Sequence, residues 1–253
     1  MSHQMIGRWV HSAITVAALL GAQLAIANPV VSTNLTTGDT IKLRSNATVG
    51  TGGGGAFQGV VLSGVDKDST FESFCLEFAE HISYGPTYHV GGVTDHTVNQ
   101  SGTYAAYSGP EVGHTSTQDP ISWQTAWLFT QFYNTHLSDT VWGAGTQVEK
   151  NTALQQAIWY FEGEDIVGSP SLNNLAKNYH DLAIEATTLG QDQLITWSGI
   201  GNVRVLNLFG DASFTQHAQD QLYMIPEPAS YSLMLGALGL MGLLARRRKT
   251  SAV

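Results

Sequence analysis

A change of hydrophobic period in the middle of this chain limits its fold more than any other feature. Between residues 39 and 93 apolar side chains alternate with polar ones, as in strands with one buried face. Between residues 119 and 189 they recur every three or four residues, as on one side of a helix. Alternation returns between residues 194 and 224. Strands on both sides of a helical block predict an α+β domain: a β-sandwich or barrel with an inserted helical subdomain (about 119–189).

Local signals set the expected bounds of these elements. The predicted strands are Asp39–Ala47, Ala56–Ser63, Thr70–Ala79, Thr87–Val93, Leu194–Trp197, Asn202–Phe209 and Phe214–Met224. The predicted helices begin at Asp119-Pro120, at Thr146 or Thr152, and at Ser169-Pro170, and the last one ends at Gly190. The second start stays open because both threonines have Glu or Gln three residues later and fit a capping box. Gly50–Gly55 is expected to be a flexible turn.

Residues 1–27 are predicted to be a secretory signal peptide. Arg8 supplies the positive charge, an apolar stretch runs from Ala13 to Ala27, and Ala25-Ile26-Ala27 forms a small-residue cleavage site. The alternative is an N-terminal membrane anchor. The cleavage site and the short apolar stretch favour removal of this segment.

The C-terminal tail has three parts in a fixed order. The motif Pro226-Glu227-Pro228 comes first, Ala229–Ala245 follows as 17 residues without a charge, and the basic residues Arg246, Arg247, Arg248 and Lys249 come last. The apolar segment is near the shortest length of a transmembrane helix, and the basic residues are expected to stop transfer. This order resembles the PEP-CTERM sorting signal of Gram-negative, exopolysaccharide-producing bacteria.

The resemblance implies how the protein is sorted. In the PEP-CTERM family an exosortase recognises the Pro-Glu-Pro motif. The precursor is held in the membrane, and the mature protein reaches the cell surface or the extracellular matrix. We therefore expect three parts: a signal peptide at 1–27, an exported domain at 28–225, and a sorting signal at 226–253 with a transmembrane helix at 229–245.

The charge of the exported domain narrows its partners. Residues 28–225 contain nineteen Asp and Glu against six Lys and Arg, a formal charge of −13. Such a surface repels the phosphates of nucleic acids, so no nucleic-acid partner is expected. The chain has no nucleophile elbow, zinc-protease motif or dinucleotide-binding glycine motif. We expect neither an enzyme nor a cofactor.

Two groups of residues are candidates for binding, and both are weak. The histidines His81, His89, His96 and His114 include no close pair of the kind that ligates metals, so no metal site is expected. The tryptophans divide into Trp123, Trp127 and Trp159 within the helical block and Trp142 and Trp197 outside its helices. The first three are expected to be core residues. The other two are the basis of an alternative carbohydrate-binding function.

Cys75 is the single cysteine of the chain, within the expected strand Thr70–Ala79. Alternation places Phe74, Leu76 and Phe78 on one face of this strand and Ser73, Cys75 and Glu77 on the other. We expect the large apolar residues to face the core. Cys75 should then point away from it, towards whatever covers the second face.

Two short motifs resemble the internal-thioester domains of bacterial surface adhesins. Phe74-Cys75-Leu76 is similar to the cysteine motif of that family, and Leu154-Gln155-Gln156-Ala157-Ile158-Trp159 is similar to its glutamine motif. The resemblance implies a bond between Sγ of Cys75 and Cδ of Gln155, with Gln156 as the alternative register. The family fold, a β-sandwich or barrel with a helical subdomain, agrees with the order of elements read above.

This resemblance implies covalent attachment to an amine, or to a hydroxyl, on a surface protein or polysaccharide. Glu77 is the first candidate for the base and His81 the second, and Trp159 is expected to shield the bond from water. If the second helix begins at Thr152, Gln155 lies in its first turn. Free N–H groups there would stabilise the oxyanion.

A second function stays open at this stage. The protein would be a non-covalent structural or carbohydrate-binding component of the extracellular matrix. Cys75 would then be an inert buried thiol, and Gln155 would close a capping box with Thr152.

Overall fold

The computed structural model describes residues 34–45, 48–50, 54–78, 80–98, 118–164, 173–188 and 197–225, together with Met241. The chain separates into two compact units, Met1–Val30 and Val31–Val253, and every described residue belongs to the second. The predicted signal peptide, the Pro226-Glu227-Pro228 motif and the basic residues 246–249 lie outside the described residues, as does the predicted membrane helix 229–245 apart from Met241. No helix in the described part is long and apolar enough to span a membrane.

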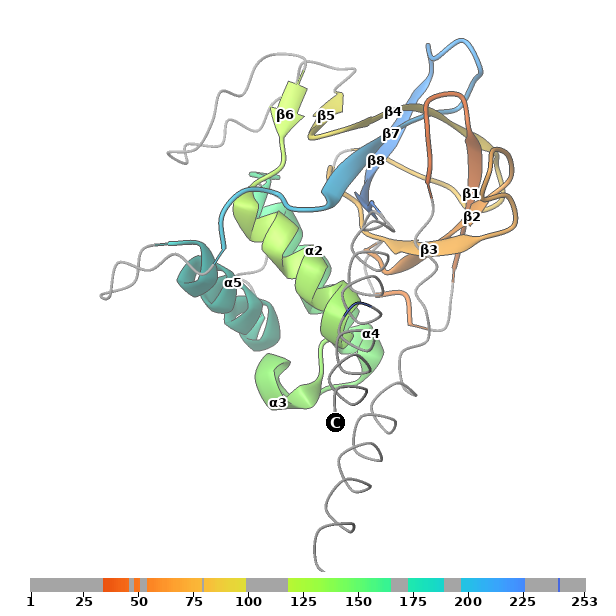
Figure 1. The fold of residues 1–253 in the computed structure, drawn as a ribbon. Coiled ribbons are helices and arrows are strands. Elements are labelled where there is room, and N and C mark those ends of the chain that lie inside the picture. Colours follow the sequence, from red (N-terminus) through yellow and green to blue (C-terminus); the bar gives the residue numbers. More distant parts are fainter. Residues whose placement is uncertain are drawn as a thin grey trace, which may run out of the picture. The chain divides into compact units, whose positions relative to one another are not determined.

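Six strands form one antiparallel sheet, in the order β3-β2-β1-β4-β7-β8 (Figure 1). They are β1 (Thr40–Arg44), β2 (Phe57–Val61), β3 (Thr70–Ser73), β4 (Tyr88–Thr94), β7 (Val203–Phe209) and β8 (His217–Met224). A separate pair joins β5 (His96–Val98) to β6 (Gln118–Pro120). Strands β2, β7 and β8 bury most of their residues, so both faces of the sheet are covered along these strands.

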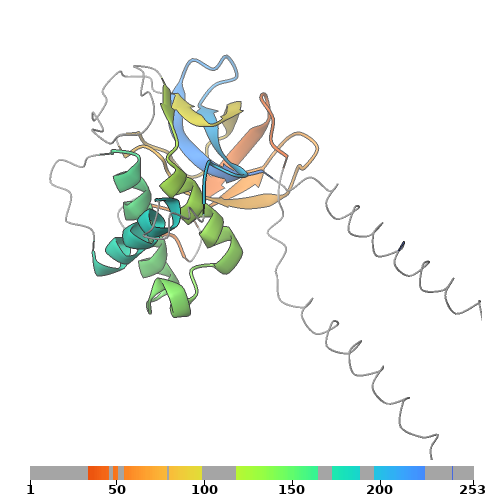
Figure 2. The ribbon, with the colours of Figure 1, turned by 60° about the vertical axis from the view of Figure 1, so that its left-hand side comes forward.

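The two edge strands of this sheet meet. Just beyond β3, Cys75 forms an antiparallel bridge with Gln221 of β8. The N–H of Leu222 donates to the carbonyl of Phe74 at 2.9 Å. These bonds bring β3 and β8 together, so the sheet curls back on itself like a barrel (Figure 2).

The helices come between β6 and β7 in the chain and pack together beside the sheet (Figures 1 and 2). They are α2 (Trp123–Thr135), the one-turn α3 (Asp139–Trp142), α4 (Gln147–Phe161) and α5 (Asn174–Thr187). The prediction of an α+β domain with helices inserted between strands is therefore confirmed.

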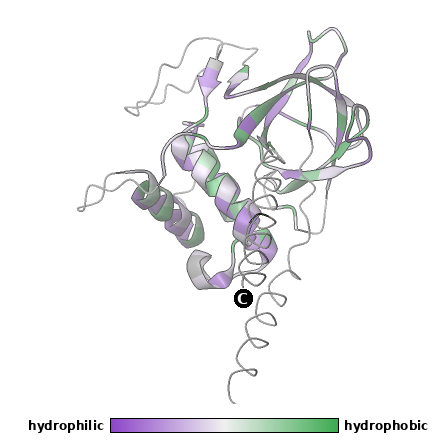
Figure 3. Ribbon diagram, viewed as in Figure 1, coloured by the Kyte–Doolittle hydropathy of each residue, from purple (hydrophilic) through white to green (hydrophobic). Residues whose placement is uncertain are grey.

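Buried apolar residues form two clusters, because one face of the sheet lines the interior of the barrel and the other face packs against the helices. The barrel cluster includes Ile41, Leu43, Phe71, Cys75 and Leu208. The helix-side cluster includes Phe74, Leu76, Phe129, Leu154 and Ile158. Apolar and polar residues are interleaved along both strands and helices, as this two-sided arrangement requires (Figure 3).

One expected strand is wrong in extent, and a second is described only at its last residue. The strand expected at Thr70–Ala79 ends at Ser73, and only the isolated bridge at Cys75 continues its pairing. The strand expected at Leu194–Trp197 falls mostly on residues outside the described part, and Trp197 itself belongs to no strand. Its indole N–H bonds the carbonyl of Gly199 within a turn instead.

Capping side chains explain where the helices begin. Of the two starts left open for α4, Thr146 is confirmed, since Thr146 and Glu149 form a reciprocal capping box. The expected start at Asp119-Pro120 is wrong because both residues pair in β6. Ser122 caps α2 instead, by accepting a hydrogen bond from the N–H of Thr125.

The expected start of the last helix at Ser169-Pro170 is wrong as well. Helix α5 begins at Asn174, after Asn173 accepts the N–H of Ala176 at 2.8 Å. The side chain of Asn173 caps the N-terminus of α5, which is the role that Ser169-Pro170 was expected to have.

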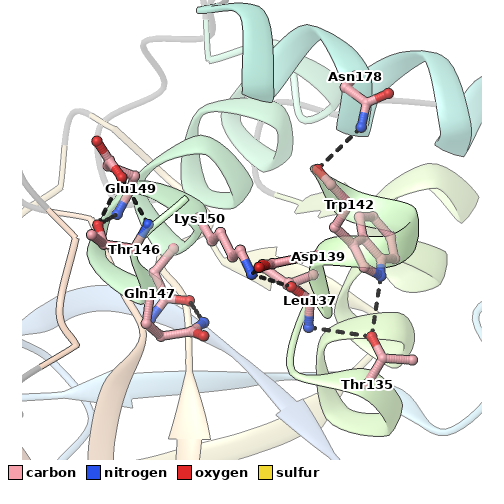
Figure 4. A network of polar contacts seen from close by, with 10 residues as sticks. Thr135, Leu137, Asp139, Trp142, Thr146, Gln147, Glu149, Lys150 and Asn178 are labelled. Carbon is pink, nitrogen blue, oxygen red and sulfur yellow. Dashed lines mark hydrogen bonds and ion pairs between the residues drawn. The ribbon is translucent and has the colours of Figure 1, made fainter. Parts of the chain in front are cut away.

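A polar network fixes the connection from α2 to α4 (Figure 4). The ammonium of Lys150, on α4, donates to the carbonyl of Leu137 at 2.8 Å and also bonds the carboxylate of Asp139. The indole N–H of Trp142 donates to Oγ1 of Thr135 at 3.1 Å. Because Lys150 is buried, these bonds both satisfy its charge and hold α4 against the segment that connects α2 to α3.

Candidate functional site

Cys75 points to the face opposite Phe74 and Leu76, as expected, but the expectation of which face holds the core of the sheet is wrong. Phe74 and Leu76 are buried as expected, but they face the helices. Cys75 points the other way, into the barrel cluster, and is fully buried. Phe78 does not join Phe74 and Leu76, since it is 40% exposed. The error has a physical cause: both faces of this segment are buried, so large apolar side chains do not mark a single core.

The side-chain amide of Gln155 reaches from α4 to the backbone of Cys75. Its Nε2 donates to the carbonyl of Cys75 at 2.8 Å, and its Oε1 accepts the N–H of Cys75 at 3.0 Å. Oε1 also accepts the N–H of Gly55 at 3.1 Å. Gln155 is 1% exposed, so these bonds form away from water. The neighbouring Gln156 makes no such contact among the described residues.

This geometry places two backbone N–H groups on the carbonyl oxygen of one buried amide. Donors held in this way stabilise negative charge that develops on the oxygen when a nucleophile attacks the carbonyl carbon. The expected donors were those of a helix N-terminus, and that expectation is wrong because α4 begins at Gln147. Gln155 therefore lies well inside the helix. The donors come instead from Gly55 and Cys75.

The glycines before β2 make room for this amide. A Cβ atom on Gly54 would lie 2.4 Å from Cγ and 2.8 Å from Cβ of Gln155, closer than van der Waals contact allows. Gly54 and Gly55 are both buried. The expected flexible turn is thus, at these two positions, a close packing surface for Gln155. Residues 51–53 lie outside the described part.

The thiol of Cys75 bonds two glutamines of β8. Its S–H donates to Oε1 of Gln219 at 2.9 Å, and Nε2 of Gln221 donates to the sulfur at 3.5 Å. Burial raises the pKa of the thiol to about 12, with a smaller contribution from Glu77, while the bond from Gln221 lowers it. The thiol is therefore protonated at neutral pH.

Gln219 and Gln221 are site residues that the sequence reasoning missed. The sequence does contain a hint of them in the segment His217–Gln221. Gln219 and Gln221 are two residues apart, so their amides lie on the same face of a strand that also carries apolar residues. Polar side chains on an inward strand face need partners, and here the partner is the cysteine.

Glu77, the first candidate for the base, is buried beside other acids. Both of its carboxyl oxygens are without a hydrogen-bond partner within the described part of the chain. Burial, together with the nearby Glu80, Asp220 and Glu164, raises its pKa to about 11. The carboxyl is therefore protonated at neutral pH and does not act as a carboxylate base there.

His81 and Trp159, the other two expected site residues, both line a cavity of about 320 Å³ beside Cys75. Gln219, the partner of the thiol, lines the same cavity. Trp159 is 6% exposed and lies one helical turn after Gln155. The structure thus brings Cys75, Gln155, Trp159 and His81 into one region.

The tryptophans expected to bind carbohydrate do not form a platform. Trp142 is 1% exposed and packs edge-on against Tyr179 and tilted against Trp127. Trp123 also departs from expectation, since it is 36% exposed rather than a core residue. Within the described residues no group of three or more His, Cys, Asp or Glu side chains is placed to hold a metal ion.

Comparison with known proteins finds one similarity. Residues 225–249 match the family model described as the PEP-CTERM protein-sorting motif. No curated protein and no solved structure matches the chain. The matched residues are those of the three-part tail. The chain therefore carries a PEP-CTERM sorting signal, which marks an exported protein that is sorted by an exosortase to the cell surface.

Proposed function

We propose that this exported protein attaches covalently to its target through an internal thioester between Cys75 and Gln155. One observation carries the proposal. The Gln155 amide is buried against Cys75, and its carbonyl oxygen accepts N–H groups from Gly55 and Cys75 at 3.1 and 3.0 Å. That arrangement activates the carbonyl carbon towards a nucleophile, and the nearest strong nucleophile is the Cys75 sulfur.

Formation of the thioester is an internal acyl transfer. The Sγ–Cδ bond forms and the Cδ–Nε2 bond of Gln155 breaks. The thiol proton leaves with the amide nitrogen as ammonia, so atoms and charge balance without an external reactant. The oxyanion of the tetrahedral intermediate lies at the position where Oε1 now accepts its two hydrogen bonds.

The thiol must first leave its partners on β8. In the structure it bonds Gln219 and Gln221, whereas the Gln155 amide bonds the backbone of Cys75. Rotation about χ1 of Cys75 turns the sulfur from the barrel cluster towards α4. Burial favours the neutral thiol, so the proton moves in concert with attack rather than before it.

In the transfer step, the acyl carbon Cδ of Gln155 passes from the sulfur of Cys75 to the target. An amine nitrogen bonds Cδ, the Cδ–Sγ bond breaks, and the amine proton reaches the sulfur to give a free thiol. A hydroxyl on a polysaccharide is the second type of target and would form an ester. His81, in the cavity beside Cys75, is the base in this proposal, and Trp159 limits the access of water.

Sorting delivers this chemistry to the cell surface. We propose that the signal peptide is removed near Asn28 and that the tail is cut near Pro226-Glu227-Pro228, after its apolar helix and Arg246–Lys249 have held the precursor in the membrane. Peptide mapping of the two ends of surface-extracted protein tests this step. Recovery of intact 229–253 in the mature form contradicts it.

Intact mass of freshly purified protein tests the thioester. The wild-type chain should weigh one ammonia less than its processed sequence. Methylamine should add at Gln155 and release one thiol that then reacts with a thiol reagent. Cys75→Ala and Gln155→Ala should each abolish both changes, since each removes one end of the bond.

The chain offers matched controls for this experiment. Gln156→Ala removes the adjacent amide, which makes no contact with Cys75 among the described residues, and should leave the mass deficit intact. Gln219→Ala frees the thiol from its β8 partner and should also preserve it. Full sequence mass in fresh wild-type protein would overturn the proposal.

The competing function is a non-covalent structural protein of the matrix. The observation that favours it is the thiol itself, which is fully buried, hydrogen-bonded to two amides and protonated at neutral pH. Gln155 would then serve only to tie α4 to the sheet. The mass measurement separates the two functions, because only the thioester loses ammonia.

A further inference from the structure

The cavity beside Cys75 has features that the thioester does not explain. It holds about 320 Å³ and is lined by Phe57, Phe78, Glu80, His81, Ile82, Tyr84, Trp159 and Gln219. Phe78 is 40% exposed and Tyr84 is 50% exposed, so solvent reaches it. Its volume is in the range of sites for small ligands.

Aromatic rings make up half of the lining residues. Phe78 and Trp159 meet edge-to-face with ring centroids 5.0 Å apart. Phe57 and Tyr84 form a second pair, tilted by 54° at 6.0 Å. Two angled pairs present ring faces in different directions, which suits a cation with an alkyl chain better than a flat sugar ring.

An acidic residue lines the cavity, and two further acids lie near it. Glu80 lines the cavity, and no residue that lines it is Lys or Arg. Glu77, three residues before Glu80, is 4% exposed, and its carboxyl oxygens have no N–H or hydroxyl donor in the described part of the chain, with the Glu80 carboxyl as its neighbour. Glu164 approaches from the end of α4 and accepts the N–H of Phe78 at 2.9 Å.

A buried carboxyl without a partner is costly, and native structures seldom leave one. Here the cost is met by protonation, since burial and the neighbouring acids raise the pKa of Glu77 to about 11. A bound cation would remove that cost directly. A metal ion is a poor fit, because the described residues offer no cluster of three ligands.

We propose that this cavity is a non-covalent binding site for an alkylammonium group of the kind a lysine side chain carries. The rings of Phe78, Tyr84 and Trp159 contact the methylene chain, and the ammonium lies towards Glu80 and Glu77. This binding needs neither the thiol nor the thioester.

Binding is measured on the full chain carrying Cys75→Ala, in which no thioester forms. The outcome is therefore independent of the covalent proposal. The probes are Nα-acetyl-lysine methylamide, its neutral counterpart with a hydroxyl in place of the ammonium, and glucosamine. Calorimetry or NMR titration should show the lysine derivative binding at least about tenfold tighter than the neutral probe, a difference of about 1.4 kcal/mol.

Two variants locate the site. Glu80→Gln and Tyr84→Leu should each weaken binding of the lysine derivative about three- to tenfold. Glu185→Gln and Tyr160→Leu are matched controls, since these residues are exposed on the helices and do not line the cavity. They should bind like the parent.

Three outcomes overturn the proposal. The first is equal affinity for the charged and neutral probes, and the second is tighter binding of glucosamine than of the lysine derivative. The third is unchanged binding in both cavity variants when circular dichroism shows them folded. Normal binding together with full sequence mass in the wild type would support this site and reject the thioester.

Discussion

The two sides of the segment around Cys75 differ in chemistry although both are buried. On the helix side, Phe74 and Leu76 pack among aromatic and aliphatic residues of α2 and α4. On the barrel side, the Cys75 thiol lies among amides, with acids close behind it. Gln155 reaches across from the helix side and bonds the backbone of Cys75 between the two. The difference separates a packing face from a face that holds polar groups in a defined arrangement.

This contrast shows where the stability of the domain is expected to reside. Apolar burial on the helix side supplies free energy through area and close packing. The polar groups on the barrel side supply little net free energy but cost much if one partner is removed. Substitutions on the two sides should therefore lower the free energy of unfolding for different reasons: lost apolar packing on the helix side and unpaired polar groups on the barrel side.

With a free thiol in the wild type, the largest effect is expected on the helix side. Phe74→Ala removes a fully buried ring that lies 5.0 Å from Phe132 and 6.2 Å from Phe129, measured between ring centroids. The free energy of unfolding should fall by about 3–5 kcal/mol. Urea denaturation measures this. A loss below about 1 kcal/mol would show that the two sides do not differ as described.

Cys75→Ala gives the matching measurement on the barrel side. With a free thiol in the wild type, the loss should be about 1 kcal/mol. A thioester would also close a loop of 80 residues, and by analogy with a disulfide that adds about 4–5 kcal/mol. Untreated wild type compared with methylamine-treated wild type isolates the contribution of the closed loop, because the treatment opens the bond.

The next effect concerns pH and involves two buried acids. Burial raises the pKa of Glu162, at the end of α4, to about 7, and that of Asp220, on β8, also to about 7. The folded state therefore binds more protons than the unfolded state between about pH 4 and 7. Stability should be greatest at the acidic end of this window and fall as pH rises through it, by at most about 3–4 kcal/mol for each group.

Melting temperature against pH measures this slope. Glu162→Gln keeps an oxygen that accepts from Ser122, so the fold should survive while part of the slope disappears. Glu185→Gln, at an exposed position of α5, should leave the slope unchanged. Stability that rises between pH 5 and 7 in the wild type would contradict the assignment of these two buried acids.

A smaller effect tests the contact that joins the two sides. Gly54→Ala places a methyl group 2.4 Å from Cγ of Gln155, so the side chain must move and its bonds to Gly55 and Cys75 weaken. The expected loss is about 1–3 kcal/mol. Gly210→Ala is the control, because its nearest neighbour is 3.4 Å away. In the thioester proposal the variant also slows or prevents the loss of ammonia.

Much of the fold could be predicted from the sequence, because periods of 2 and 3.6 residues appear in segments long enough to distinguish. The change of period alone gave the helical block between two sets of strands. The position of Gln155 against Cys75 followed from two motifs whose residues lie 80 positions apart. The local pattern did not determine which side of the sheet the cysteine faces, since both sides are buried.

Other site residues were beyond the reach of local patterns. The curled sheet brings three further residues to the site: Gln219, Gln221 and Gly54. The residues adjacent to them in the sequence do not indicate these tertiary contacts. The start of α4 was a different problem, because two threonines in the same segment fit one capping rule equally well.

The smallest predicted effect decides between those two threonines in solution. Thr146→Ala removes the hydroxyl that accepts the N–H of Glu149, and it should lower the free energy of unfolding by about 1 kcal/mol. Thr146→Ser keeps the oxygen and should restore most of that loss. The distinction matters for the site: with α4 capped at Thr146, Gln155 is held inside a formed helix, where end fraying does not reach it. Thr146→Ala should therefore leave the methylamine reaction at Gln155 unchanged. A variant that loses that reaction while still folded would place Gln155 near the helix end and return the oxyanion donors to the helix N-terminus.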